Sequence, residues 1–289
     1  MQIAIVTTLL AAAAGQLTTG PVELISEDYT FSEGPLWLPD GRWVFSDVPR
    51  DTIYVSDGSV FRKPSNGANG LALDPQGRLI ACESNLHRIT RTEPDGSITV
   101  LAESYNGKPL NTTNDVVVRS DGVVFFTDPK GIGQKEGTGT GFNGVYAILA
   151  DGTVKLLNDD MRYPNGIGLS PDEKTLYVTD FSGGNIRAFD VSASADVSNP
   201  RIFCEIRNPD GIAVDAAGRV WSSTVRGISA FAPDGSFIEN IDFEGMPTNC
   251  AFGGSDGRTL FITARKRIYR VQCNEPGLSF AATADASGN

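Results

Sequence analysis

The sequence predicts an all-β fold built from six repeats, and three observations support this prediction. First, a residue with a side-chain oxygen opens a short apolar stretch at six places, which are Glu33, Asn69, Asn114, Asn165, Asp210 and Asn249. Second, successive openings lie 36, 45, 51, 45 and 39 residues apart, a spacing typical of repeat proteins. Third, most of the stretches meet a turn signal such as Ser120-Asp121-Gly122, and no helical pattern separates them. Strand-only repeats of this length favour a six-bladed β-propeller.

The first 20 residues differ from the rest of the chain. Ile3 to Ala14 is an apolar run of about the length of a signal-peptide core, with small residues and a cleavage point at Ala14-Gly15, although no Lys or Arg precedes it. We interpret residues 1–20 as a signal peptide, which would make the protein periplasmic or secreted. The alternative is a disordered or loosely packed segment on a cytoplasmic protein. The run is too short to span a bilayer.

Residues 21–273 are predicted to form the propeller. Val22 to Ile25 has the pattern of a short strand, and the last repeat supplies only three strands, near Asn249 to Phe252, Thr259 to Thr263 and Arg267 to Gln272. If the N-terminal strand joins this last blade, it closes the ring and leaves no exposed sheet edge. Residues 274–289, rich in Ala, Ser, Gly and Asn, are predicted to be a disordered tail.

The opening residues of the six repeats, hereafter the opening residues, are predicted to form a site. In a propeller the innermost strand of each blade lines the central channel, so the residues that open these strands converge near the axis at one end. All six carry oxygen donors, with two negative charges and neither sulfur nor imidazole. Such donors suit Ca²⁺ or Mg²⁺ and fit zinc poorly. The alternative is that they cap strands and hold water in the channel.

A second polar set is expected to support the first from the same end of the channel. It lies 14 residues after each opening residue, or 15 in the fourth repeat, at the end of each second strand. Its members are Asp47, Glu83, Asp128, Asp180, Thr224 and Thr263.

Composition limits the function classes. With 35 acidic and 24 basic residues the net charge is -11, which disfavours nucleic acid and anionic membrane surfaces as partners. The single histidine, His87, excludes a His-rich zinc site, and no G-x-S-x-G sequence supports a serine hydrolase triad. We expect His87 on the surface or at the channel rim. The four cysteines lack C-x-x-C spacing, and either a Cys250–Cys273 disulfide or buried free thiols would fit them.

One insertion stands out between the second and third strands of the third repeat. Residues 129–144 read PKGIGQKEGTGTGFNG, rich in glycine and without a strand pattern. We expect a loop over the channel mouth, with Phe142 as its apolar tip.

Several segments resemble a known family. SEGPLW (32–37), LNTTNDVVVRSDGVVFFTDP (110–129), PNGIGLSPDEKTLYVTD (164–180), PDGIAVD (209–215) and TNCAFGGSDGRTLFIT (248–263) are similar to the gluconolactonase branch of the SMP-30/gluconolactonase/luciferin-regenerating-enzyme family. The likeness covers nearly all of residues 30–272. It implies a six-bladed propeller with a divalent metal, usually Ca²⁺, in the central channel. The family includes lactone hydrolases and, more distantly, organophosphate hydrolases.

The resemblance also implies roles for individual residues. Glu33 of S-E-G-P, Asn165 of P-N-G and Asp210 of P-D-G match the family's metal ligands, and Asp210 matches its proposed catalytic base. Asn114 of N-D matches a position that completes the metal shell or contacts substrate. Thr112 stands where some members have a substrate-binding arginine, and Cys82-Glu83-Ser84-Asn85 replaces a frequent C-E-H-G. We expect substrate contacts from the following residues: Asn114, Asn69, Thr112 and Asn249.

The sequence therefore predicts a Ca²⁺-dependent hydrolase that opens a sugar-type lactone. The cation, for which Mg²⁺, Mn²⁺ or Zn²⁺ could substitute, would polarise the carbonyl, and water would attack it. A phosphotriesterase or other esterase with the same ion is one alternative. Another is a binding propeller in which the ion is only structural. The expected partner is a small-molecule lactone, with no nucleic acid and no membrane span. Oligomeric state is not predicted.

Overall fold

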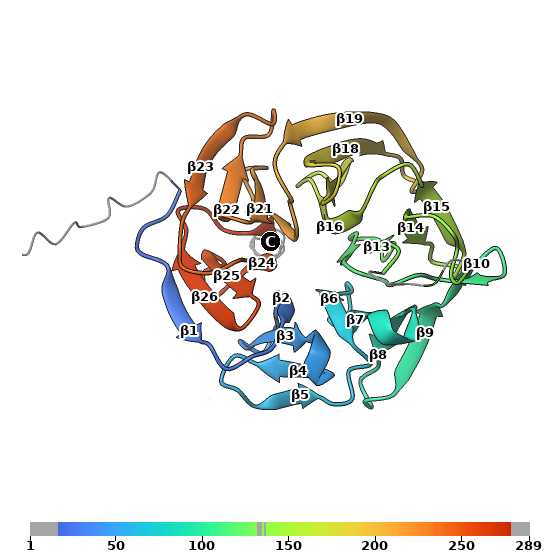
Figure 1. The fold of residues 1–289 in the computed structure, drawn as a ribbon, viewed down its shortest axis with the longest axis horizontal. Coiled ribbons are helices and arrows are strands. Elements are labelled where there is room, and N and C mark those ends of the chain that lie inside the picture. The colour runs from blue at the N-terminus through green and yellow to red at the C-terminus, as the bar shows by residue number, and fades with distance from the viewer. Residues whose placement is uncertain (1–16, 132–134, 136, 279–289) are drawn as a thin grey trace, which may run out of the picture.

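Six four-stranded antiparallel sheets surround a central channel in the computed structural model (Figure 1). The model describes residues 17–131, 135 and 137–278. This arrangement confirms the predicted six-bladed β-propeller. In the described part of the chain, no helix has the length and apolar character needed to cross a membrane.

Within blades one to five, the strands follow one another in chain order from the channel outward. Blade one contains β2 (Ser32–Trp37), β3 (Trp43–Asp47), β4 (Thr52–Val55) and β5 (Val60–Arg62). Blade two contains β6 (Ala68–Leu73), β7 (Leu79–Glu83), β8 (Arg88–Thr92) and β9 (Ile98–Ala102). Blade three contains β12 (Val116–Val118), β13 (Val124–Asp128), β14 (Gly144–Ile148) and β15 (Val154–Asn158).

The remaining blades and the short elements complete the chain. Blade four contains β16 (Pro164–Leu169), β17 (Thr175–Asp180), β18 (Asn185–Val191) and β19 (Val197–Glu205). Blade five contains β20 (Ile212–Val214), β21 (Val220–Thr224), β22 (Gly227–Phe231) and β23 (Phe237–Ile241). Blade six contains β24 (Asn249–Gly253), β25 (Thr259–Ala264), β26 (Arg267–Gln272) and β1 (Glu23–Ser26). Outside the blades lie η1 (Val48–Arg50), η2 (Ser84–Leu86), β10 (Ser104–Tyr105) and β11 (Lys108–Pro109).

The N-terminal strand closes the ring, as predicted. β1 pairs antiparallel with β26, with Glu23 opposite Arg270 and Leu24 opposite Tyr269. It begins one residue later than the predicted strand. An ion pair of 2.8 Å joins the side chains of Glu23 and Arg270. The outer edge of blade six is therefore covered by a segment that lies more than two hundred residues away in the sequence.

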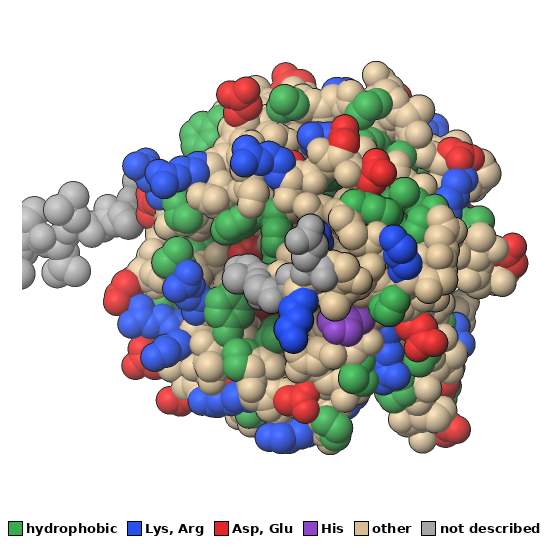
Figure 2. All heavy atoms as spheres, turned by 45° about the vertical axis from the view of Figure 1, so that its right-hand side comes forward, with side chains coloured by type: hydrophobic (Ala, Val, Ile, Leu, Met, Phe, Trp, Pro, Cys, Tyr) green, Lys and Arg blue, Asp and Glu red, His purple; other side chains and the backbone are tan. Residues whose placement is uncertain are grey.

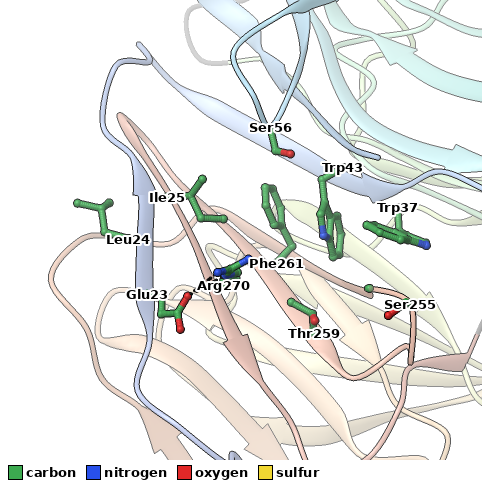
Figure 3. Close-up of a pocket in the computed structure, with 11 residues that line it drawn as sticks. Glu23, Leu24, Ile25, Trp37, Trp43, Ser56, Ser255, Thr259, Phe261 and Arg270 are labelled. Atoms are coloured by element: carbon green, nitrogen blue, oxygen red, sulfur yellow. Dashed lines mark hydrogen bonds and ion pairs between the residues drawn. The ribbon is translucent and has the colours of Figure 1, made fainter. Parts of the chain in front are cut away.

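Aromatic packing reinforces the seam between blades six and one. The ring of Trp43 stacks on that of Phe261 with centroids 4.3 Å apart, and Trp37 meets Trp43 edge to face at 5.2 Å. Figure 3 shows these rings beside β1, at one side of a groove of about 470 Å³. Blades one and six thus share apolar contacts that the N-terminal strand alone could not provide.

The core lies between neighbouring blades. Strands β13 and β14 are buried along their whole length. In the same apolar cluster, Ile80 and Cys82 of blade two pack with Val116 and Phe126 of blade three. Because close packing of this kind resists displacement, the innermost strands are held at fixed positions around the channel.

The packed part of the chain extends beyond residues 21–273 at both ends. Leu17 is buried in the core of blades five and six, and its N–H donates to Glu239. At the other end, the N–H of Gly277 donates to the carbonyl of Gly257 at 2.9 Å, and Leu278 packs against blades four and five. The predicted signal run, Ile3 to Ala14, lies outside the described residues, as does most of the predicted tail, 279–289.

All four cysteines are buried free thiols. The sequence left open a Cys250–Cys273 disulfide or buried free thiols, and the structure has the free thiols. Burial raises the pKa of the thiols of Cys82, Cys204, Cys250 and Cys273, which disfavours the reactive thiolate form.

Candidate active site

All six opening residues lie at the start of the innermost strands. Glu33, Asn69, Asn165 and Asn249 fall within the first two residues of β2, β6, β16 and β24. Asn114 and Asp210 come two residues before β12 and β20. The six positions therefore meet at one end of the channel, as the propeller geometry requires.

Close backbone contacts hold this end of the channel together. The N–H of Gly70 donates to the carbonyl of Asn114 at 2.8 Å, so blade two is bonded to blade three. The hydroxyl of Thr127 donates to the carbonyl of Asn165 at 2.6 Å, and that of Thr179 donates to the carbonyl of Asp210 at 2.7 Å. Each of these bonds ties an opening residue to the adjacent blade.

Glycine follows four of the opening residues because there is no room for a side chain. A Cβ on Gly34 would lie 2.1 Å from the carbonyl oxygen of Asn69, and one on Gly70 would lie 2.3 Å from Oδ1 of Asp115. Gly34 also has a φ of 46°, a left-handed conformation that glycine adopts readily. The glycines allow the opening residues of neighbouring blades to approach one another.

The side chains of Glu33, Asn165 and Asp210 lie close enough to interact at this end of the channel, and this group of side chains is hereafter called the chamber. Glu33 and Asn165 are buried, Asp210 is half-buried, and the side chain of Asn165 lies close to the carboxylate of Asp210. Burial, together with the charge of Asp115, raises the pKa of Asp210 to about 7. Burial and the charges of Asp210 and Asp115 hold the pKa of Glu33 well above its usual range. These carboxylates therefore repel one another.

Asp115 is a site residue that sequence reasoning missed. Its carboxylate accepts the N–H groups of Val116 at 3.0 Å and Ile167 at 3.4 Å, and the amide of Asn249 lies 3.5 Å away. Burial raises its pKa to about 6. The sequence did contain a signal for Asp115: the other five repeats have Gly or Cys directly after the opening residue, and only this repeat has a carboxylate there.

Asp115 and Asn249 adjoin the chamber. The side-chain amide of Asn249 lies 3.5 Å from the carboxylate of Asp115, and the side chain of Asn249 is also near enough to Glu33 to lower the pKa of that carboxyl. Asp115 and Asn249 also line a channel cavity of about 610 Å³, together with mainly apolar residues of the innermost strands. These two residues therefore lie next to both the chamber carboxylates and this cavity. Asn249 was expected to contact the substrate, and in the structure its side-chain amide lies against the carboxylate of Asp115.

The other expected substrate contacts lie around the chamber. Asn114 and Asn69 are half-buried, and the carbonyl of Asn69 accepts the hydroxyl of Ser46 at 2.9 Å. Thr112 is half-buried, and its hydroxyl lies so close to Gly131 that a Cβ there would be 2.4 Å away. Thr112 thus faces the insertion that begins at residue 129.

The second polar set holds the loops that lead to the opening residues. Asp47 accepts the N–H groups of Thr30 at 2.9 Å and Phe31 at 3.2 Å. Asp180 accepts those of Arg162 at 3.0 Å and Tyr163 at 2.9 Å. Each of these loops ends two residues later at an opening residue, so these carboxylates position the chamber from behind.

Asp128 and Glu83 vary this arrangement. Asp128 accepts both the N–H and the side-chain amide of Asn111, and burial raises its pKa to about 7. Glu83 is fully buried, where it pairs with Arg62 at 2.6 Å and Arg88 at 2.7 Å. In blade six, Thr263 accepts the N–H of Asn249 at 3.1 Å, whereas Thr224 bonds within its own hairpin.

Asn111 ties the insertion to the propeller. Its amide donates to Thr140 and to the carbonyl of Phe142, both at 2.8 Å, and its carbonyl contacts the ring of His87. Phe142 packs against the core of blades two and three. Phe142 was expected to be the apolar tip of a loop over the channel mouth; instead it is half-buried against this core, where its carbonyl accepts the amide of Asn111.

Two further side chains reach the chamber from the mouth. Burial and then the charges of Asp210 and Glu33 raise the pKa of Tyr163, whose ring meets that of Phe181 edge to face at 6.1 Å. The charge of Arg265 acts on Asp210 in the opposite direction, lowering its pKa. Figure 2 shows basic and apolar side chains side by side on one face of the molecule.

The chamber's donor set fits a hard divalent cation. Glu33 and Asp210 supply carboxylates, and Asn165 and Asn114 can add amide oxygens, the ligand types that Ca²⁺ prefers. Among the described residues, no group of three or more His, Cys, Asp or Glu side chains is arranged to hold a metal. A cation here would therefore depend on amide oxygens as well, and it would offset the repulsion between the buried carboxylates.

Comparisons with known proteins agree on one family. The family described as SMP-30/Gluconolactonase/LRE-like region matches residues 31–266. The gluconolactonase of Zymomonas mobilis is 31% identical, over 87% of this chain and 81% of its own. The pentonolactonase XacC of Haloferax volcanii is 27% identical over 80% of each chain. A solved gluconolactonase from Xanthomonas campestris superposes with a TM-score of 0.80 at 32% identity, over 87% of this chain and 89% of its own.

Proposed function

The chain belongs to the SMP-30/gluconolactonase/LRE-like family, and from this premise we propose that it is a Ca²⁺-dependent lactonase that opens a sugar-type lactone. The observation that carries the proposal is the chamber itself, in which Glu33, Asn165 and Asp210 share one end of the channel. Relatives named gluconolactonase and pentonolactonase support the substrate class.

The proposed ligands are Glu33, Asn165 and Asp210, with Asn114 completing the set or contacting the substrate. When bound, the cation would polarise the lactone carbonyl and stabilise negative charge on its oxygen, a contribution of several kcal/mol. The loops held by Asp47 and Asp180 keep the ligand side chains in place, so little reorganisation is needed.

Asp210 is the proposed general base. A carboxyl with a pKa near 7 can accept a proton at neutral pH with useful driving force. Asp210 would take a proton from water as the water oxygen attacks the carbonyl carbon. The bond from that carbon to the ring oxygen then breaks, and the proton passes to this oxygen, giving the hydroxy acid. Direct contact with a cation would lower the pKa of Asp210, so its ligand role and its base role compete.

A substrate panel tests the proposal. Proton release would be measured with sugar, aliphatic and aryl lactones and with a phosphotriester, in Ca²⁺ and then in a chelator, with the uncatalysed rate subtracted. We expect the highest kcat/KM for a sugar lactone and a loss of at least about a hundred-fold on chelation, which Ca²⁺ restores.

Each other outcome has a definite meaning. Faster hydrolysis of the phosphotriester would replace the lactonase proposal with the phosphotriesterase alternative. Bound Ca²⁺ without turnover of any substrate would favour a binding propeller with a structural ion. Undiminished lactone hydrolysis after complete removal of metal would contradict the proposed dependence on Ca²⁺.

A further inference from the structure

The turn between β25 and β26 carries a basic residue to the chamber. β25 runs antiparallel to β24, with Thr263 opposite Asn249, so the turn that follows β25 lies at the same end of the channel as the opening residues. Arg265 is in this turn. Its carbonyl accepts the N–H of Ser32 at 2.7 Å, and Ser32 directly precedes Glu33. The backbone of Arg265 is therefore fixed beside a proposed metal ligand.

The backbone conformation at Arg265 favours a different residue. Its φ is 56°, in the left-handed region where glycine or asparagine is more readily accommodated than arginine. Local structure alone therefore does not account for an arginine at this place.

The Arg265 guanidinium is free while neighbouring arginines are paired. Arg267 forms ion pairs with Glu27 and Glu244, and Arg270 pairs with Glu23. Arg265 is exposed, and within the described part of the chain its side chain has no hydrogen bond or ion pair. Its charge nevertheless acts on Asp210 in the chamber. Near this acidic site there is thus a guanidinium, that of Arg265, without a partner among the described residues.

The chemistry of lactone opening suggests a role for the Arg265 guanidinium. A sugar lactone presents hydroxyl, carbonyl and ring oxygens, and the product is a carboxylate. A guanidinium offers five N–H donors in a planar fork that matches oxygen pairs of this kind. The chamber carboxylates would repel an anionic product, whereas a cation at the mouth would attract it. Tyr163 and Phe181 of blade four supply an aromatic wall at the same site.

We propose that Arg265 is the residue that positions the substrate, donating hydrogen bonds to the oxygen atoms of the lactone and pairing with the carboxylate of the hydroxy acid product. This inference rests on the proposed lactonase function. It assigns substrate recognition to the β25–β26 turn of blade six, whereas Thr112 of blade three carries no charge and faces Gly131.

The test compares three variants of Arg265 with a matched control. Arg265→Met removes the charge but keeps much of the length, Arg265→Lys keeps the charge without the fork, and Arg265→Asn suits the left-handed turn. Lys266→Met removes one charge from the adjacent exposed position. For each variant, kcat and KM for the sugar lactone and the inhibition constant of its hydroxy acid anion would be measured in Ca²⁺.

We expect Arg265→Met and Arg265→Asn to raise KM and the inhibition constant together by about 10-fold to 100-fold, as loss of hydrogen bonds to a charged group predicts. In both variants kcat should change little. Arg265→Lys should lie between them and the wild type, and Lys266→Met should match the wild type. If KM and the inhibition constant rose as much in Lys266→Met, the effect would be a general one of charge, and the assignment of substrate positioning to Arg265 would be overturned.

The outcomes separate this inference from the function on which it rests. Suppose that the wild type opens lactones, and that KM and the product inhibition constant of Arg265→Met stay within about twofold of the wild-type values. The role of Arg265 is then refuted and the lactonase function stands. If the wild type opens no lactone of the panel, the proposed function fails, and substrate positioning by Arg265 fails with it. Arg265→Met could also change thermal unfolding where Arg265→Asn does not. In that case, a rise in KM that both variants share would be due to lost substrate binding and not to lost stability.

Discussion

Asp210→Asn is expected to lower kcat/KM for the sugar lactone by at least about a hundred-fold, within the range for loss of a general base. The substitution preserves the shape of the side chain, so the new amide should stay close to Asn165. It removes the proton acceptor and one of the two carboxylates proposed to hold the cation. Turnover with saturating Ca²⁺ is the quantity to measure, because excess cation separates loss of the base from loss of metal affinity.

A matched control distinguishes this effect from a general effect of losing an aspartate. Asp234 lies in an exposed turn, where it accepts the N–H and hydroxyl of Ser236, and Asp234→Asn should retain full activity. Thermal unfolding of both variants would verify that they fold. An Asp210→Asn protein that is folded, binds Ca²⁺ and turns over at the wild-type rate would exclude Asp210 as the base.

Ca²⁺ is expected to stabilise the protein by about 2.7 kcal/mol at a free concentration one hundred times its dissociation constant. For a chain of 289 residues that corresponds to a rise in Tm of about 4–5 °C. The physical reason is the group of buried carboxylates, since burial raises the pKa values of Glu33, Asp210 and Asp115, and neighbouring carboxylates raise those of Glu33 and Asp210 further. A cation would offset that repulsion. Calorimetry in Ca²⁺ and in a chelator measures the difference.

The same carboxylates predict a pH dependence in the chelated protein. The pKa of Asp210 is raised from 3.8 to about 7, so the folded state binds this proton more tightly than the unfolded state. Its contribution to stability is therefore present below about pH 4 and lost as pH rises towards 7. In a chelator at pH 8, Asp210→Asn should unfold at a higher temperature than the wild type.

Glu33→Gln provides the variant for the calorimetric experiment. It should lose most of the Tm rise that Ca²⁺ produces, while Glu205→Gln, at an exposed position on β19, should keep it. An equal rise in Glu33→Gln and the wild type would mean that Ca²⁺ binds elsewhere on the chain.

The fold was predictable because the repeat is visible in residues that the architecture constrains directly. Each innermost strand has an oxygen-bearing residue at or just before its start. In four blades a glycine follows this residue, and at Gly34 and Gly70 the structure leaves no room for a side chain. The closing strand was also predictable, because the last repeat has only three strands and a propeller needs a partner for the fourth position.

What the sequence did not reveal depends on contacts between distant segments. Leu17 packs beside Glu239, 222 residues away, and no local pattern indicates this. Phe142 turns inward because Asn111, from an earlier loop, binds its carbonyl. Asp115 stands where the other repeats have Gly or Cys, but that difference alone does not show its role; its position at the channel cavity, beside the other carboxylates, does.

The central claim is that one cation is held on the channel axis by side chains from different blades. Crystals grown in Ca²⁺ and measured at a long wavelength would locate the ion by its anomalous scattering. We predict a single strong peak in the chamber, about 2.3–2.6 Å from side-chain oxygen atoms of Glu33, Asn165 and Asp210. A peak outside the chamber, or none at a Ca²⁺ concentration that supports turnover, would contradict it.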